Sequence, residues 1–477
     1  MIQINGRKTV TMNLLTLENI WNAAGGSYFG PKENLKKAIA GTIQDSRKIE
    51  KDWLFLAAKG EKTDGHRFIS DVYEKGALAV ICERELTDAD APEGRSIDEF
   101  SFIVVPDTFA ALRKLAAWYR KQLDVKVVGI TGSVGKTSTK EMIAATLGVR
   151  YRVLKTEGNF NNAIGLPLTI MRLKADDEIA VLEMGISDFG EMSLLSSMAR
   201  PDICVITNIG QCHLETLGDR DGIYLAKTEM FHYLRDGGRA VLNGSDDKLA
   251  ATEAVCGRVP EFFNDGRQSF ASDIESLGLL GTRAVLHFKG RQIDVTIPVP
   301  GEHQVTNALA AAAVGDILGL TDDEIRNGIS DTQGLSGRGN IIRTGKNIII
   351  DDCYNANPAS MRAALKLLSG APGRRVAVLG DMFELGTDEA ELHRQVGLAM
   401  ADKSMRPDVL ICIGKLSGNI YEGAPDDVDK HMYPDKSEFL KYAADLLQDG
   451  DTILFKASHG MEFSKLVDGM RSRFDQS

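Results

Sequence analysis

The residues best suited to chemistry lie between positions 125 and 147, where a glycine-rich turn is followed by a lysine and a threonine. Three valines in 125–128 are typical of a buried strand. The turn at 131–135 contains two glycines, which let the backbone curl so that N–H groups face phosphate oxygens at a helix N-terminus. This pattern predicts a P-loop, in which Lys136 reaches the β- and γ-phosphates and the Thr137 hydroxyl ligates Mg²⁺.

One position departs from the strict P-loop pattern, which requires glycine where this chain has Ile130. An ordinary glycine turn before a helix is therefore the alternative interpretation. The residues that follow favour phosphate binding, because their spacing predicts a helix with one buried face. That face consists of Met142, Ile143, Thr146 and Leu147.

Further polar residues follow the predicted strands of the same segment. Glu183 ends a strand within 179–185, and His213 follows a strand within 203–209. Ligands of parallel sheets collect beyond the carboxyl ends of the strands, so a Mg²⁺ contact is predicted for Glu183. His213 fits a loop histidine and a site residue equally well. Lys227 is interpreted as a helical lysine on a solvated face.

Three other polar segments each allow two interpretations. The asparagines of 159–162 suit either a loop with left-handed backbone or an amide-lined substrate site. Asn307, at the start of the Ala-rich stretch 308–313, suits either a helix cap or a hydrogen-bonding partner for a base. Ser46 and Arg47 could hold a phosphate, but a helix cap beside a surface charge is the favoured interpretation.

The elements that must position these residues form an α/β protein of three domains. Residues 1–105 are predicted to form a small α/β domain, and residues 106–335 a central P-loop domain with a doubly wound parallel sheet. Residues 336–477 predict a Rossmann-like domain without a GxGxxG motif, and hence without a dinucleotide site. Four buried strands are expected there, within 348–352, 376–379, 409–413 and 452–455.

Composition limits the classes of protein to which the chain can belong. At 477 residues with 43% hydrophobic and 26% charged residues, it is typical of a globular protein. A net charge of −11 argues against nucleic acid as the main partner. No apolar run reaches the ~18 residues of a membrane span, and residues 1–13 lack a signal-peptide core. Six scattered cysteines without a CxxC pair favour reduced thiols in a cytoplasm.

Taken together, the motifs resemble those of the Mur ligase family of peptidoglycan synthesis, whose P-loop also lacks the first glycine. The resemblance extends over all three predicted domains. It is closest to the branch that joins D-alanyl-D-alanine to UDP-N-acetylmuramoyl-tripeptide. The matching segments are 131–137, 183–185, 208–213 and 226–229, and those typical of the branch are 45–47, 64–66, 351–358 and 380–386.

The resemblance implies an ATP-dependent ligase with bound Mg²⁺ and assigns roles to individual residues. Catalytic roles fall to Lys136, His213 and Lys227, and Lys227 would be carbamylated by CO₂. Metal sites would involve Thr137, Glu183, His213 and Lys227. The implied ATP-binding residues are Thr131, Gly132, Ser133, Val134, Gly135, Lys136, Thr137, Asn307, Arg338, Asp352, Tyr354 and Asn355. The implied substrate-binding residues are Ser46, Arg47, Asn159, Asn162, Asn357, Lys456 and His459.

The chain departs from the family near its C-terminus, where His459 stands in place of a common arginine. A histidine cannot form the two-pronged clamp that an arginine forms on a carboxylate. We therefore expect Lys456 and backbone N–H groups, rather than His459, to hold the carboxylate of D-alanyl-D-alanine.

Two competing classes remain to be distinguished. A sibling ligase, either another Mur enzyme or a folylpolyglutamate-synthase-like protein, is disfavoured by the segment 354–358, Tyr-Asn-Ala-Asn-Pro. A P-loop switch without ligation is disfavoured by the combination of Glu183, His213 and Lys227 and by the third domain. The sequence therefore predicts a cytoplasmic, monomeric ligase that binds no nucleic acid and has no membrane span.

Overall fold

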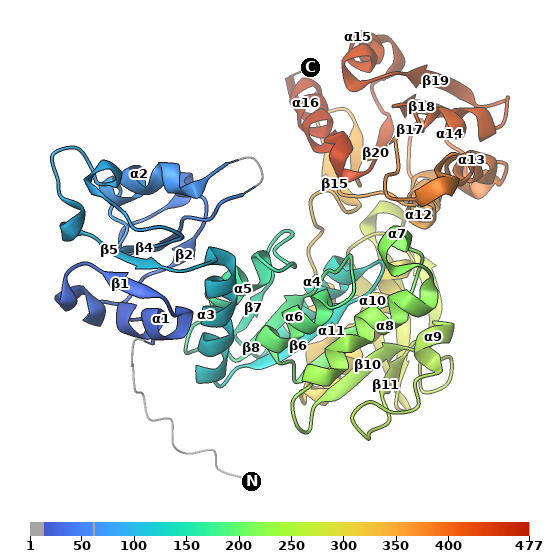
Figure 1. Cartoon of the computed structure of the whole chain (residues 1–477). Helices are drawn as coiled ribbons and strands as arrows, with labels where there is room; N and C mark the ends of the chain where they lie inside the picture. The colour runs from blue at the N-terminus through green and yellow to red at the C-terminus, as the bar shows by residue number, and fades with distance from the viewer. Residues whose placement is uncertain (1–13, 61–62, 477) are drawn as a thin grey trace. The chain divides into compact units, whose positions relative to one another are not determined.

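The computed structural model describes residues 14–60 and 63–476 of the chain (Figure 1). The segment 1–13, for which the absence of a signal peptide was predicted, lies outside the described residues. The described strands form four sheets, and the three larger ones contain parallel strands flanked by helices. The predicted three-domain α/β architecture is confirmed.

The N-terminal sheet has the strand order β1-β5-β4-β3-β2, with only β1 antiparallel to its neighbour. Its apolar core includes Val80 and Cys82 of β4. Leu17, Ile20 and Ala24 form the buried face of the first helix. The elements are α1 (Leu17–Ala24), β1 (Ser27–Phe29), β2 (Thr42–Ile43), β3 (Leu54–Leu56), α2 (Ile69–Glu74), β4 (Ala79–Cys82) and β5 (Ser101–Val104).

The central sheet has the order β11-β10-β9-β6-β8-β7. Non-consecutive neighbours such as β6 and β9 require crossovers, and helices supply these, as the predicted strand–helix alternation requires. The strands are β6 (Lys126–Thr131), β7 (Val153–Lys155), β8 (Ile179–Glu183), β9 (Ile203–Ile206), β10 (Arg239–Asn243) and β11 (Glu261–Phe263). The helices are α3 (Thr108–Gln122), α4 (Lys136–Gly148), α5 (Gly165–Ile170), α6 (Glu191–Ala199), α7 (Leu214–Leu217), α8 (Arg220–Thr228), α9 (Asp247–Ala250), α10 (His303–Ile317) and α11 (Asp322–Ser330).

A small antiparallel sheet of three strands, not anticipated from the sequence, lies between β11 and α10 in the chain. Its strands are β12 (Ser269–Ser276), β13 (Thr282–Phe288) and β14 (Arg291–Ile297). Lys289 and Gly290 join β13 to β14 and both have positive φ, 49° and 78°, as a tight hairpin turn requires. The simple strand–helix alternation predicted for 106–335 is therefore interrupted here.

The C-terminal sheet has the order β15-β16-β20-β17-β18-β19, with β15 antiparallel and the other strands parallel. Alternate residues of its strands enter two separate apolar cores, one with α12 to α14 and the other with α15 and α16 (Figure 1). This doubly wound arrangement confirms the Rossmann-like prediction. The elements are β15 (Asn340–Arg343), β16 (Ile348–Asp351), α12 (Pro358–Ser369), β17 (Arg375–Gly380), α13 (Glu389–Ala399), β18 (Val409–Ile413), α14 (Gly418–Gly423), β19 (Asp429–Tyr433), α15 (Lys436–Leu446), β20 (Thr452–Lys456) and α16 (Phe463–Gln476).

Two findings bear on the compositional predictions. Within the part of the chain that the structure describes, no helix has the length and apolar character needed to cross a membrane. All six cysteines are free thiols.

Candidate active site

The predicted phosphate-binding turn begins where β6 ends. Ile130, which replaces the usual glycine, is fully buried inside that strand, so the turn starts only at Gly132. Gly132 has φ 149°, and a β-carbon there would lie 1.9 Å from the Thr207 hydroxyl oxygen, so no larger residue fits. Gly135 has φ 84° and directly precedes α4. The two glycines thus perform the steric roles that the P-loop pattern predicted.

Asn208, which follows β9, fixes the shape of this turn. Its side-chain oxygen accepts hydrogen bonds from the backbone N–H of Ser133 (3.1 Å) and of Val134 (2.9 Å). Its side-chain nitrogen donates to the Val134 carbonyl at 3.0 Å. These two N–H groups are therefore used within the protein, which leaves the N-terminus of the 13-residue helix α4 as the part of the turn suited to an anion. Sequence reasoning gave Asn208 no individual role, because its partners lie 74 and 75 positions away.

Lys136 is the first residue of α4 and lies over the turn. Its ammonium group donates to the carbonyl oxygens of Gly132 (2.8 Å) and Ser133 (3.4 Å). Thr137, the next residue, is 6% exposed and is also at the start of the helix. A cation and a hydroxyl are thus held at the positive end of a helix dipole, where an anionic ligand is stabilised.

Lys227 on α8 is buried, so the prediction that it lies on a solvated face was wrong. It is 1% exposed and shares the apolar side of α8 with Ile223 and Ala226. Burial, followed by the positive charge of Lys136, lowers the pKa of Lys227 to about 7. No carboxylate of the described residues contributes to this pKa. A large fraction of Lys227 is therefore a neutral, nucleophilic amine near neutral pH.

Glu183, the last residue of β8, is 1% exposed and hydrogen-bonded to its neighbours. Its Oε1 accepts a hydrogen bond of 2.9 Å from the side-chain amide of Asn161, and its backbone N–H donates to the Thr156 hydroxyl at 3.0 Å. Asn161 is thus the asparagine of this segment that contacts Glu183, whereas Asn159 and Asn162 are those predicted to bind substrate. Asn159 is exposed, and Asn162 accepts from the N–H groups of Ile164 and Gly165 at the start of α5.

His213 has left-handed backbone, with φ 49°, and directly precedes α7. Its side chain is 29% exposed, so the imidazole is accessible. Among the described residues, no group of three or more histidine, cysteine, aspartate or glutamate side chains is gathered as a metal centre. The predicted metal residues therefore fit Mg²⁺ only if the Thr137 hydroxyl and oxygens of a bound phosphate complete the coordination. Oxygen-rich coordination of this kind is what Mg²⁺ prefers.

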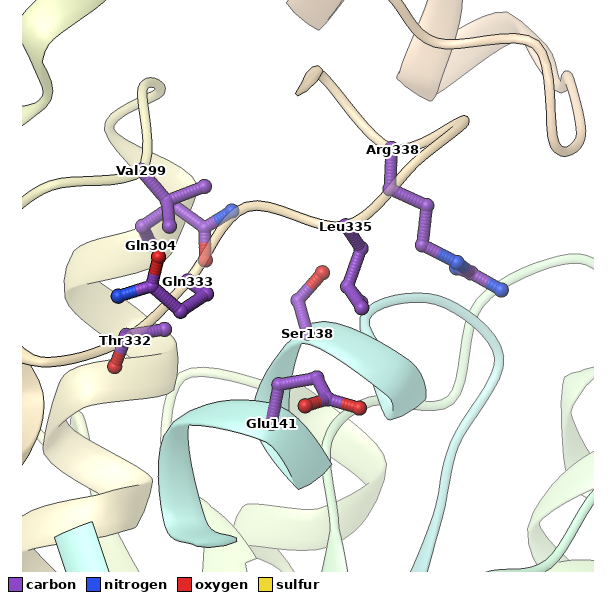
Figure 2. Close-up of a pocket in the computed structure, with 8 residues that line it drawn as sticks. All are labelled: Ser138, Glu141, Val299, Gln304, Thr332, Gln333, Leu335 and Arg338. Carbon is purple, nitrogen blue, oxygen red and sulfur yellow. The ribbon is translucent and has the colours of Figure 1, made fainter. Parts of the chain in front are cut away.

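A small pocket lies beside the P-loop helix (Figure 2). Ser138 and Glu141 of α4 form one side, and Leu335 of the segment after α11 points toward them. The remaining lining residues are Val299, Gln304, Thr332, Gln333 and Arg338. Asn307 lies inside α10 and is therefore not its cap. Its side chain accepts from Thr139 and donates to Gln304, each at 2.8 Å.

Polar groups also gather at the carboxyl ends of the C-terminal strands, where they bind one another. Lys456 is 2% exposed, and its ammonium group contacts Asp352 Oδ2 (2.6 Å) and the carbonyl oxygens of Asp352 (3.4 Å) and Asn355 (3.1 Å). Asn357 caps α12 by accepting from the Ser360 N–H. The exposed His459 ring lies 5.6 Å from the Tyr354 ring, centroid to centroid.

The predicted N-terminal substrate residues lie on the surface of their domain. Arg47 is 85% exposed and forms two hydrogen bonds of 2.9 Å with Asp45, which lower the pKa of that carboxyl group. Asp45, rather than Ser46, accepts from the Arg47 N–H and caps the short helix Ser46–Lys48. A hollow of about 260 Å³ in the same domain offers further polar groups. It is lined by Asp64, His66, Arg67, Ser70, Arg84, Ala89 and Asp90.

Comparison with known proteins was made against family models, curated sequences and solved structures. The model of the Mur ligase family, catalytic domain, matches residues 39–120. The Mur ligase middle domain matches residues 130–315, and the Mur ligase, glutamate ligase domain matches residues 337–459.

Individual relatives extend over almost the whole chain. A UDP-N-acetylmuramoyl-tripeptide–D-alanyl-D-alanine ligase of Bacillus subtilis is 38% identical over 95% of this chain and 97% of its own length. A crystal structure of MurF from Acinetobacter baumannii is 33% identical, with a TM-score of 0.84 over 96% of this chain and 98% of that one. MurF from Thermotoga maritima, solved in complex with ADP, is 28% identical, with a TM-score of 0.76 over 91% and 98%. The chain belongs to the Mur ligase family.

Proposed function

We propose that the protein is an ATP-dependent ligase that joins D-alanyl-D-alanine to UDP-N-acetylmuramoyl-tripeptide in peptidoglycan precursor synthesis. The structural observation that supports this most directly is a buried lysine of lowered pKa, Lys227, near the P-loop lysine, Lys136. A P-loop switch that only binds and releases a nucleotide has no need of a second, reactive amine at the phosphate site. The length over which the relatives match supports the choice of substrates.

The chemistry follows from the charges at the turn. The tripeptide carboxylate attacks the γ-phosphorus of ATP, the bond to the β-phosphate oxygen breaks, and an acyl phosphate and ADP result. The Lys136 ammonium group and the N-terminus of α4 stabilise the charge on the transferring phosphoryl group. The amine of D-alanyl-D-alanine then attacks the acyl carbon, phosphate leaves, and the amide bond is complete.

We propose Glu183, Thr137 and His213 as the residues that hold Mg²⁺. A buried carboxylate and a hydroxyl suit this ion, and β8, which ends in Glu183, neighbours β6 in the sheet. Mg²⁺ would supply positive charge for the phosphate oxygens. The neutral amine of Lys227 suits reaction with CO₂, in which an N–C bond forms and a proton leaves, giving a carbamate oxygen donor.

We propose that the N-terminal domain binds the UDP end of the substrate around Ser46 and Arg47, and that Asn159, Asn162 and Asn357 line its peptide end. The sequence led us to expect that Lys456 and backbone N–H groups hold the dipeptide carboxylate. The contacts of Lys456 argue against its part in this, because its three N–H donors already bind Asp352 and Asn355. The exposed His459 and nearby backbone N–H groups are then the better candidates. We further propose that the enzyme is monomeric and cytoplasmic; its free thiols fit a reducing compartment.

The test is the dependence of ATP hydrolysis on both acceptors. Phosphate release by the purified protein should require UDP-N-acetylmuramoyl-tripeptide and D-alanyl-D-alanine together, with one UDP-N-acetylmuramoyl-pentapeptide formed per phosphate. Release with neither substrate would favour a P-loop switch. Release with an L-amino acid in place of the dipeptide would favour a sibling ligase.

A further inference from the structure

The segment that joins α11 to the C-terminal sheet contains a tight turn, Leu335–Arg338. The Arg338 N–H donates to the Leu335 carbonyl at 3.1 Å. Gly337, the third residue of the turn, has φ 77°, as a type II turn requires at that position. The turn ends in Arg338, which is among the residues that line the pocket beside the P-loop helix (Figure 2).

One buried carboxylate fastens this turn to the C-terminal sheet. Asp351, the last residue of β16, is 3% exposed. Its Oδ2 accepts from the Gly337 N–H at 2.7 Å and from the Ser336 hydroxyl at 3.2 Å. Its Oδ1 accepts from the Cys353 thiol at 2.7 Å. Both oxygens of Asp351 thus accept hydrogen bonds. Two of the three donors, Ser336 and Gly337, belong to the turn, and the third, Cys353, follows β16.

The same turn is held from a second side by Tyr354. The Tyr354 N–H donates to the Gly337 carbonyl at 2.9 Å, and the Arg338 guanidinium lies 3.9 Å from the centre of the Tyr354 ring. A β-carbon on Gly337 would lie 3.2 Å from that of Tyr354, so the fit is close. The Arg338 guanidinium is therefore held over the Tyr354 ring, and the two residues that fasten its turn, Asp351 and Tyr354, both belong to the C-terminal domain.

We propose that Asp351 is a positioning residue for the reaction: by holding the turn, it presents the Arg338 guanidinium to the nucleotide phosphates. This inference rests on the proposed function and on the ATP-binding role that the family resemblance implies for Arg338, which lines the pocket beside the P-loop helix. Asp351 itself touches no substrate. It acts through Arg338, so its removal should weaken nucleotide binding only while Arg338 is present.

The test is a double-mutant cycle on nucleotide affinity. In Asp351→Asn one acceptor oxygen becomes an NH₂ group that faces a donor, so the turn loosens. We expect the ADP dissociation constant, measured by titration calorimetry, and the KM for ATP to rise about tenfold, with kcat changed less. Arg338→Ala should have a similar effect, and the double variant should be no worse than Arg338→Ala alone.

A matched control is Asp451→Asn, which removes another buried carboxylate of the same domain, 1% exposed and bound to Arg374. It should lower the thermal midpoint without changing the ADP dissociation constant. If Asp351→Asn does not fold, Gly337→Ala disturbs the same turn from its other side and should couple to Arg338→Ala in the same way.

Two outcomes would overturn the proposal: equal ADP affinity in Asp351→Asn and Asp451→Asn, or effects of Asp351→Asn and Arg338→Ala that multiply. A wild-type protein that binds ADP but does not ligate would contradict the proposed function instead. The binding cycle separates these two failures.

Discussion

Lys227 on α8 and Lys456 at the end of β20 are buried to nearly the same degree, 1% and 2% exposed, yet their surroundings differ. Lys456 contacts the Asp352 carboxylate at 2.6 Å and two carbonyl oxygens. Lys227 has Lys136 as its main charged neighbour, and its pKa is lowered to about 7. A buried ammonium group needs a counter-charge. Lys456 therefore holds two strand ends together, whereas the lowered pKa of Lys227 leaves part of it as a neutral amine near neutral pH.

The two regions around these lysines differ in the same sense. At the P-loop, glycines and Asn208 shape the backbone, and the Lys136 ammonium group lies over the turn at the N-terminus of α4. At the ends of β16 and β20, Asp351, Asp352 and Lys456 bind one another and the backbone. We infer that chemistry is performed in the first region and that the second region supports it.

The largest effect should come from Lys136→Ala, which removes the cation nearest the transferring phosphoryl group. We expect kcat to fall by roughly 10³-fold or more, with the thermal midpoint little changed, because Lys136 is only half-buried and lies on the turn rather than in an apolar core. Lys126→Ala, at the exposed start of β6, is the matched control and should retain activity. Coupled phosphate-release kinetics measure both, and near-normal turnover of Lys136→Ala would remove the P-loop from the mechanism.

Lys227→Ala should lower kcat by roughly 10²- to 10³-fold through loss of one electrostatic contribution. Because we propose that a carbamate provides this contribution, added formate should restore part of the activity. Added formate should not change the activity of Lys456→Ala. If formate raised the activity of both variants, the contrast between the two lysines would be wrong. Activity of Lys227→Ala without formate, or mass spectra in bicarbonate that never show the added CO₂, would contradict the carbamate.

For Lys456→Ala we expect a loss of stability rather than of chemistry. Removing one partner of a buried ion pair costs about 3–5 kcal/mol, and we expect roughly 2 kcal/mol because the Asp352 side chain is 22% exposed. Urea denaturation measures the change. Asp352→Asn in the Lys456→Ala background should recover part of the loss, and a further loss instead would show that the pair is not the cause.

The pH dependence of stability should distinguish the two lysines by a smaller amount. The folded pKa of Lys227, about 7, lies below the unfolded value of about 10.4, so the unfolded chain binds more protons between these values. The Lys227 contribution to the unfolding free energy therefore rises with pH in this window. In CO₂-free buffer, wild type should gain about 1–2 kcal/mol over Lys227→Met between pH 7 and 9. If the difference in unfolding free energy between wild type and Lys227→Met stayed constant with pH, the pKa of Lys227 would not be lowered in the folded protein.

Local sequence was enough to predict the buried strands of the parallel sheets and the glycine turn after β6, because β-branched runs and glycine turns are formed by neighbouring residues. All four strands expected in the C-terminal domain are observed within one or two residues. Two local signals were missed. Ile223, Ala226 and Lys227 have the spacing of one buried helix face, and the segments joined by Lys289–Gly290 alternate as hairpin strands do.

What the sequence by itself determined is the order of the elements, the steric need for Gly132 and Gly135, and the identity of the charged groups at the strand ends. Only the tertiary structure decided which of those groups meet. Asn208 reaches the turn from 75 positions away and Lys456 reaches Asp352 from 104 positions away, distances at which no local pattern is informative. The reactivity of Lys227 likewise depends on burial and on Lys136, a charge 91 positions distant in the chain, so it arises only when the chain has folded.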